Sequence, residues 1–328
     1  MNRNNVLVIT NKEDLTVDFV IEAFKLRNIN YYRFNTEDIG TIVNISFGGN
    51  GYTLFDSKKS KLININDFGS VYFRRPKLPR PDAGLTFGEQ QFYITEISTY
   101  LEGVYRSLAS RFWLNSVFDI RFAENKPHQL SVAKSIGFLV PEFSISNDPK
   151  ICENFIKKHD RCIFKPLKSG LIEEPEGIGK VLYTTKVDSN FIDKITTNGA
   201  MPIYLQRQII KQSDIRATVV GDKVFGAKIL SQDSDVSTID WRKSDAILPH
   251  ERIDIPSEIK GMCLRLCERF NLNFAAIDFI LDHSGHFWFL EINPNGQWAW
   301  IESLLGYPIS NEIAGLLLTG GKDDSKAH

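Results

Sequence analysis

Residues 274–296, FAAIDFILDHSGHFWFLEINPNG, are the stretch from which the fold of this 328-residue chain can be predicted. Two runs of aromatic and β-branched residues flank four turn formers, Asp-His-Ser-Gly, and this pattern predicts a β-hairpin. If Leu281 faces His286 across the turn, Asp278 pairs with Phe289.

Three oxygen-bearing side chains interrupt this apolar hairpin: Asp278, Glu291 and Asn293. Alternation with period two places all three on one face of the sheet, whereas a slip of one residue in the pairing would separate them. Hard oxygen ligands of this kind bind Mg²⁺, usually together with waters and nucleotide phosphates. The structural alternative is a pair of buried carboxylates neutralised by Arg or Lys, since two neighbouring carboxylates need a counter-charge in either case.

The size and charge of the chain limit its class. A length of 328 residues exceeds one ordinary core and predicts two or three domains. The net charge of −1 provides no global basic field, so we expect neither a nucleic-acid nor a membrane partner. No apolar stretch approaches the length needed to span a bilayer.

The cysteines are too few for a disulfide framework, and the first residues, Met-Asn-Arg-Asn-Asn, lack the apolar region of a signal peptide. We therefore expect a cytoplasmic protein. Cys263 and Cys267 have the spacing of metal ligands on a helix. They also fall on the apolar stripe of Ile259, Met262, Leu266 and Phe270, which favours core packing.

The N-terminal part predicts a small parallel sheet. Residues 6–9 and 31–34 have strand composition, and helix-spaced apolar residues lie between them in 14–28. The residues after the first strand, Thr-Asn-Lys-Glu, cannot form a glycine-rich phosphate turn, so a dinucleotide site is not expected there. The polar segment 115–125 is the first predicted domain boundary.

Two arginines end the next predicted strand, 71–73. Arg74 and Arg75 could hold carboxylates or phosphates through forked hydrogen bonds, but a solvated or ion-paired arginine pair is an equal alternative. A buried strand in 215–220 contains another arginine, Arg216. Its burial is costly unless the guanidinium meets an anion, and we expect either phosphates or an acidic neighbour.

The middle of the chain predicts a helix over 126–136 and strands over 161–165 and 181–184. A loop with several glycines lies between these two strands. Its backbone N–H groups could lie over a triphosphate, although a mobile hairpin loop would have the same composition. A last amphipathic helix is predicted near 308–318, ended by a Gly-Gly pair.

These residues, taken in chain order, resemble the ATP-grasp ligases. The resemblance rests on Lys126, Lys165, the glycine loop, the 206–210 edge, Asp214-x-Arg216, Asp278 and Glu291-x-Asn293. Within that family the chain is most similar to the graspetide synthetases, the microviridin-type peptide macrocyclases. That likeness rests on YFRRP at 72–76, DWR at 240–242 and NGQW at 295–298.

The resemblance implies a mixed α+β or α/β protein: an ATP-grasp fold with an N-terminal pre-ATP-grasp α/β domain. The implied domains are a pre-ATP-grasp domain, 1–120, a central ATP-grasp subdomain with the glycine hairpin, 121–200, and a C-terminal subdomain with the Mg²⁺ site, 201–322. Residues 323–328 are expected to form a disordered tail.

The family also implies residue roles. Lys126 and Lys165 would hold the α- and β-phosphates, and Asp214 would lie near the ribose. Arg216, with Lys165, would act in catalysis by stabilising the transferred phosphoryl group or by holding a substrate carboxylate. The implied ATP loop contains Gly170, Gly177 and Gly179; the adenine edge comprises Gln206, Arg207, Gln208 and Ile209; the peptide-binding residues are Arg74, Arg75 and Arg242. Many ATP-grasp enzymes carry Glu at the position of Arg207 or Gln208.

The implied activity uses ATP and Mg²⁺ to activate Glu or Asp side chains of a peptide as acyl phosphates. Ser or Thr hydroxyls, or Lys amines, then form esters or amides, with release of ADP and phosphate. The implied partner is a ribosomal precursor peptide with a leader and an acidic core, and the implied assembly is a homodimer. The alternatives are a ligase that adds amino acids to a protein tail, like the ribosomal-protein glutamate ligases, and a nucleotide-binding regulator without catalysis.

Overall fold

The computed structural model describes residues 5–168, 171–172, 180–187, 191, 199, 201–233, 239 and 248–321. The chain divides into two compact units, and the second comprises residues 121–270 and 275–294. The first unit combines residues 1–120 with 271–274 and 295–328, so the C-terminal residues join the N-terminal ones instead of extending the expected C-terminal subdomain. The further division of residues 121–322 into two subdomains stays a prediction.

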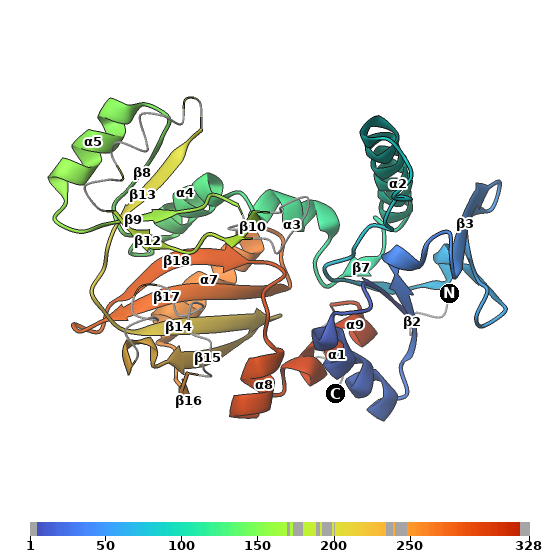
Figure 1. The fold of residues 1–328 in the computed structure, drawn as a ribbon. Coiled ribbons are helices and arrows are strands. Elements are labelled where there is room, and N and C mark those ends of the chain that lie inside the picture. The colour runs from blue at the N-terminus through green and yellow to red at the C-terminus, as the bar shows by residue number, and fades with distance from the viewer. Residues whose placement is uncertain are drawn as a thin grey trace. The chain divides into compact units, whose positions relative to one another are not determined.

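A four-stranded parallel sheet forms the centre of the first unit (Figure 1). The apolar run 6–9 is completely buried in it, and the predicted parallel β-α-β arrangement is confirmed. The strand order is β2-β1-β6-β7. The elements are β1 (Asn5–Thr10), α1 (Leu15–Leu26), β2 (Asn30–Asn35), β6 (Ser70–Phe73) and β7 (Phe112–Trp113).

The first unit also contains a three-stranded antiparallel sheet. The long helix α2 (Phe87–Ser107) contacts β4 and begins at a capping box in which Thr86 and Glu89 satisfy each other's backbone N–H groups. The strands are β3 (Val43–Gly48), β4 (Gly51–Asp56) and β5 (Lys61–Asn64), and short 3₁₀ turns occupy η1 (Thr36–Asp38) and η2 (Ile65–Asp67).

The C-terminal helices complete this unit. Helix α9 (Ile309–Thr319) contacts α1, β1 and β6, and Gly320 ends it with a φ of 65°, as the glycine pair predicted. Helix α8 (Ala299–Leu305) was not predicted. It is only seven residues long, and its Gly306 cap lies directly before the predicted start of the next helix.

The second unit contains a sheet of order β12-β9-β13-β8. The predicted strand over 181–184 is wrong: only Val181 lies in a strand, β11, and residues 182–184 connect it to β12. The Thr185 hydroxyl donates to the Tyr183 carbonyl in this connection. The elements are α3 (Val117–Ala123), α4 (Lys126–Ile136), β8 (Phe143–Ser146), α5 (Pro149–Lys158), β9 (Cys162–Lys165), β10 (Leu171–Ile172), β11 (Lys180–Val181), β12 (Thr185–Lys186) and β13 (Ile203–Arg207).

A five-stranded sheet of order β16-β15-β14-β17-β18 carries the hairpin from which the fold was predicted. Helix α7 (Ser257–Arg269) contacts β14 and buries Cys263 and Cys267, whose burial raises the pKa of the Cys267 thiol to about 12. The predicted core packing of both thiols is confirmed. The strands are β14 (Lys211–Val220), β15 (Lys223–Ile229), β16 (His250–Arg252), β17 (Phe274–Asp282) and β18 (Phe287–Asn293), with a 3₁₀ turn η3 (Ser231–Asp233).

The hairpin forms, but the predicted register is wrong. Leu281 pairs with Phe287 and not with His286, so Phe289 pairs with Phe279. The ladder then shifts between Asp278 and Phe279, which leaves Leu290 as an extra residue and pairs Asp278 with Glu291. Within the turn, the Asp282 carboxylate accepts the backbone N–H groups of Ser284 and His286. None of the helices that the structure describes is both long and apolar enough to cross a membrane.

Candidate active site

The three predicted metal ligands share one face of the hairpin. Asp278 and Glu291 are direct cross-strand partners, and partners in a ladder project to the same side. Asn293 follows Glu291 by two residues and therefore projects to that side as well. The bulge in β18 restores the arrangement that the predicted register would have produced by a different pairing. Whether the three side chains ligate Mg²⁺ stays a prediction.

Each carboxylate has a cation beside it. Arg216 on β14 forks onto Asp278, with Nε 2.5 Å from Oδ1 and Nη2 3.1 Å from Oδ2. Lys126 Nζ lies 3.2 Å from Glu291 Oε2 and donates to the Pro166 carbonyl at 3.0 Å. The acidic neighbour expected for Arg216 is thus present, and both carboxylates have the counter-charge that a metal site and an ion-paired site require alike.

Helix α4 brings a further residue to this strand. Lys126 is its first residue, after Asn125, whose side chain accepts the His128 N–H at 3.0 Å. Gln129, one turn later and 3% exposed, bonds to Ile292 at both backbone groups: Nε2 donates to its carbonyl at 2.8 Å and Oε1 accepts its N–H at 3.3 Å. The sequence reasoning missed Gln129, although its i+3 spacing from Lys126 places both on one helix face.

The second predicted phosphate-binding lysine lies on the other sheet of this unit. Lys165 on β9 is 8% exposed, and its Nζ donates to Gln206 Oε1 at 3.3 Å. Gln206 in turn donates to the Tyr204 hydroxyl at 3.1 Å. Burial, and then the negative charge of Glu291, raise the pKa of Tyr204. The Tyr204 hydroxyl is therefore within electrostatic reach of the candidate metal ligands.

The predicted adenine edge is partly engaged within the protein. The N–H of Arg207 donates to the Glu142 carbonyl at 2.8 Å, and the N–H of Gln208 donates to the Arg161 carbonyl at 3.0 Å. The Gln206 side chain is directed to Lys165 and Tyr204. These two N–H groups could bind a base only if their present bonds broke. We therefore keep the Gln208 carbonyl and Ile209 as the predicted adenine contacts of this edge.

Asp214, predicted to lie near a ribose, is buried with a lysine. Lys211 Nζ lies 2.6 Å from Asp214 Oδ2, and the two residues are 5% and 6% exposed. A direct role at the ribose stays a prediction. Four further predicted residues lie outside the part of the chain that the structure describes: Gly170, Gly177, Gly179 and Arg242.

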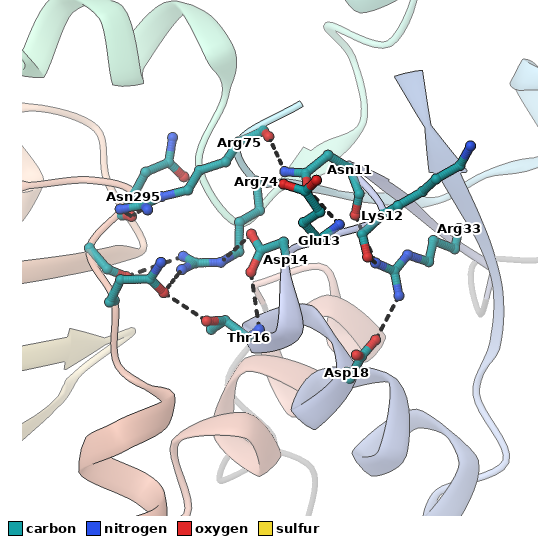
Figure 2. Close-up of polar contacts among 12 residues, drawn as sticks. Asn11, Lys12, Glu13, Asp14, Thr16, Asp18, Arg33, Arg74, Arg75 and Asn295 are labelled. Atoms are coloured by element: carbon teal, nitrogen blue, oxygen red, sulfur yellow. Dashed lines mark hydrogen bonds and ion pairs between the residues drawn. The ribbon is translucent and has the colours of Figure 1, made fainter. Parts of the chain in front are cut away.

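Arg74 is an interior residue of the first unit. It is 1% exposed, and its Nε lies 3.0 Å from Asp14 Oδ2 (Figure 2). Its other nitrogens donate to the Gly296 carbonyl at 3.1 Å and to Gln297 Oε1 at 2.7 Å. A guanidinium held in this way cannot reach a peptide while these bonds persist, so its burial argues against the predicted peptide contact.

Arg75 is exposed and turns toward the same segment, as Figure 2 shows. Its Nε and Nη2 donate to the Asn295 carbonyl at 3.2 and 3.0 Å. Neighbouring residues of an extended strand project oppositely, but the φ of 45° at Arg75 breaks the extended backbone, and both arginines reach residues 295–297. YFRRP and NGQW, far apart in sequence, are therefore in contact.

The chemistry of the second unit suits a polyphosphate with a divalent cation. Lys126, Lys165 and Arg216 supply positive charge, and two carboxylates with one amide supply hard oxygen atoms. Arg216 and Lys126 neutralise the Asp278 and Glu291 carboxylates when no metal ion is bound.

Two family models match the chain, and the boundary between them lies near residue 121, where the N-terminal segment of the first compact unit ends. The family model described as the MvdD pre-ATP grasp domain matches residues 5–121. The family model described as the RimK-like ATP-grasp domain matches residues 123–317, more than half of the chain.

Solved structures match over almost the whole chain. The macrocyclase MdnC of Microcystis aeruginosa MRC, bound with precursor peptide MdnA, is 28% identical with a TM-score of 0.85, over 96% of this chain and 99% of that one. A RiPP-associated ATP-grasp ligase of Chryseobacterium gregarium, in complex with ADP and a leader and core peptide, is 27% identical with a TM-score of 0.85, over 97% of both chains.

The ATP-grasp ligase PsnB, complexed with a minimal precursor, Mg and ADP, is 22% identical with a TM-score of 0.76, over 97% of this chain and 98% of that one. At this identity the likeness concerns the fold alone. Among curated protein sequences, none matches the chain.

Proposed function

Because the chain belongs to the RimK-like ATP-grasp family, we propose that it is an ADP-forming ligase that joins side chains within a ribosomally made precursor peptide. The expected ATP-grasp fold with an N-terminal pre-ATP-grasp domain is confirmed. The peptide substrate is proposed from two of the solved relatives, which were crystallised with a precursor peptide or with a leader and core peptide.

The residues present fit ATP and Mg²⁺. Asp278, Glu291 and Asn293 offer three hard oxygen donors on one face, and the 27% identical ligase of Chryseobacterium gregarium was crystallised in complex with ADP. Lys126 and Lys165 would hold phosphate oxygens, and the Gln208 carbonyl with Ile209 would meet the adenine. ATP would supply the phosphoryl group that activates a peptide carboxylate, and bound Mg²⁺ would offset negative charge on the phosphates.

The contribution of the chain is position and charge. Arg216 can exchange its fork on Asp278 for a phosphoryl oxygen or a substrate carboxylate once a cation takes over part of the charge of Asp278. Lys126 can do the same at Glu291, since its Nζ already lies 3.2 Å from that carboxylate. The two cations are therefore held ready at the place where phosphate charge would arrive.

On the peptide side, Arg75 and Arg242 stay candidates for binding the acidic core. Arg75 is exposed, and one face of its guanidinium is fixed by the Asn295 carbonyl. We leave Arg74 out because of its burial. A leader bound away from the reacting groups would keep a weakly held core at high effective concentration through successive cyclisations.

The observation that carries the proposal is the Asp278–Glu291 cross-strand pair with Arg216 on one carboxylate and Lys126 on the other. The test is intact-mass analysis after incubation with ATP, Mg²⁺ and the short peptides encoded beside the gene. We expect losses of whole waters from one of these peptides, matched by ADP formation. The leaderless peptide should react far more slowly.

Other outcomes would redirect the proposal. Mass gains equal to added glutamate would support a ligase that extends a protein tail. Nucleotide binding without a mass change in any peptide would support a non-catalytic regulator. A homodimer and a cytoplasmic location also belong to the proposal; light scattering of the purified chain and fractionation of the source cells would test them.

A further inference from the structure

The geometry points to Gln129 as a positioning residue that sets the direction of Glu291 and Asn293 by holding the peptide groups between them. This inference rests on the proposed function, because it assigns a role toward the proposed Mg²⁺ site. In the polar contacts of the described residues, the Gln129 side chain bonds to neither the Glu291 nor the Asn293 side chain. It acts through the backbone of Ile292.

Strand β18 is the last strand in its sheet, and among the described residues no further strand forms a ladder on its outer side. Near its beginning, the N–H of Phe289 donates to the Leu139 carbonyl at 2.8 Å. Near its end, Gln129 supplies one donor and one acceptor to Ile292, the same pair of bonds that a neighbouring strand would supply. The side-chain amide thus replaces one residue of a missing strand.

The position of Ile292 makes this contact consequential. It lies between Glu291 and Asn293, and its own side chain is 2% exposed on the opposite, buried face. The two peptide groups that flank Ile292 are bonded to the Cα atoms of Glu291 and Asn293. A rotation of these peptide groups would therefore turn both neighbouring side chains. Two bonds to one residue restrain that rotation more strictly than one bond could.

Gln129 is itself well held. It is 3% exposed, and its Nε2 also donates to the Ala123 carbonyl at 2.7 Å, so the amide orientation is determined by two carbonyls and one N–H. Lys126, three residues earlier on α4, contacts Glu291 at 3.2 Å. One turn of α4 therefore contacts both the Glu291 side chain, through Lys126, and the backbone of Ile292, through Gln129.

The variant Gln129→Met removes all of these hydrogen bonds at nearly constant volume, and Gln129→Glu keeps an acceptor for the Ile292 N–H. The matched control is Asn115→Leu. Asn115 is a buried amide, 4% exposed, that bonds to the backbone of Phe274 on the other strand of the hairpin, with Nδ2 2.7 Å from the carbonyl and Oδ1 3.1 Å from the N–H. Phe274 lies four residues before Asp278 on β17, whereas Ile292 directly adjoins two of the proposed ligands, Glu291 and Asn293.

The measurement is calorimetric binding of ADP to the full chain at a series of Mg²⁺ concentrations, without turnover. Outer partners of metal ligands usually change metal affinity by about 10–100-fold, and we expect Gln129→Met to raise the Mg²⁺ requirement by that factor. Gln129→Glu should fall between Gln129→Met and the unsubstituted chain. ADP affinity without Mg²⁺ and peptide affinity should be unchanged in both variants.

The control separates positioning from stability. Asn115→Leu should lower the unfolding temperature while leaving the Mg²⁺ requirement unchanged. If Gln129→Met only lowers the unfolding temperature in the same way, or if Gln129→Glu binds Mg²⁺ and ADP like the unsubstituted chain, the positioning role is refuted. If the unsubstituted chain binds no ADP at any Mg²⁺ concentration, the proposed function itself fails.

Discussion

Two buried arginine–aspartate pairs, one in each compact unit, invite comparison. In the first unit Arg74 pairs with Asp14, and their side chains are 1% and 3% exposed. In the second unit Arg216 pairs with Asp278, and their side chains are 8% and 15% exposed. The two pairs have the same chemistry and similar burial, but their surroundings differ.

The polar partners of the first pair come from one unit. Arg74 also donates to Gly296 and Gln297, and the second oxygen of Asp14 accepts the Thr16 N–H at 3.0 Å at the start of α1. A pair surrounded in this way joins α1, β6 and the 295–297 segment. Its ion-pair geometry alone would have suggested an anion-binding site.

The second pair shares its face of the sheet with other polar side chains. Asp278 stands opposite Glu291, with Asn293 on the same side, so the Arg216 fork borders a row of oxygen atoms. The comparison teaches that a buried arginine is informative about function only through the groups beside its partner.

The largest effect is expected from breaking the first pair. Asp14→Ala leaves the buried Arg74 guanidinium without its carboxylate, which should lower the free energy of unfolding by about 3–5 kcal/mol. Urea denaturation gives this value. The pair of Asp18 and Arg33 is the control: Asp18→Ala should cost under about 1 kcal/mol, because Asp18 is half exposed and Arg33 keeps its bonds to Asn11 and Asn35. Equal losses at both pairs would show that burial does not distinguish them.

Loss of a carboxylate in the second unit should lower the rate of product formation. Glu291→Ala should reduce product formation by about 10²–10³-fold, equivalent to about 2.7–4 kcal/mol, because the Mg²⁺ that would offset phosphate charge loses one of its proposed ligands. Peptide affinity should persist, because the proposed peptide contacts lie elsewhere. Single-turnover assays and peptide titrations measure the two quantities separately. Near-normal turnover would remove Glu291 from the site.

A smaller activity change should follow from Arg216→Lys. Lysine keeps the charge but loses the two-pronged contact with Asp278, so we expect a decrease in kcat of about 10–100-fold with little change in the KM for peptide. The corresponding Arg74→Lys should act mainly on stability. A KM effect at Arg216 that exceeds its kcat effect would instead indicate that this residue binds the substrate carboxylate before reaction.

The smallest effect concerns the turn of the hairpin. Burial raises the pKa of Asp282, but hydrogen bonds from the Trp288 indole and from the N–H groups of His286 and Ser284 outweigh burial and lower the pKa to about 2. Because this pKa is depressed in the folded state, the stabilisation is present above the unfolded pKa of about 4 and is lost as pH falls toward 2.

Asp282→Asn should therefore reduce stability modestly at pH 7, and the difference from the unsubstituted chain should shrink below pH 4. Thermal unfolding at a series of pH values measures this. A difference that stays constant between pH 7 and pH 3 would show that the charge of Asp282 contributes nothing to the turn.

Local chemistry in the sequence was sufficient for much of this protein. Alternation of apolar residues predicted the parallel β-α-β opening, and Asn125, Asp148 and Gly137 mark the helix ends where capping rules place them. The polar residues of the hairpin were placed on one face even though the assumed register was wrong, because the extra residue of the bulge, Leu290, compensates the one-residue difference at the turn.

Contacts between distant segments were decided only by the tertiary structure. No local pattern states that Gln129 would complete the edge at Ile292, 163 residues away, or that Arg74 would be buried against Asp14 and the 295–297 segment. An exposed and a buried arginine have the same sequence signature, since the cost of burying the charge is met by partners that only folding brings near. The sequence determined which groups are available, and the tertiary structure determined which of them meet.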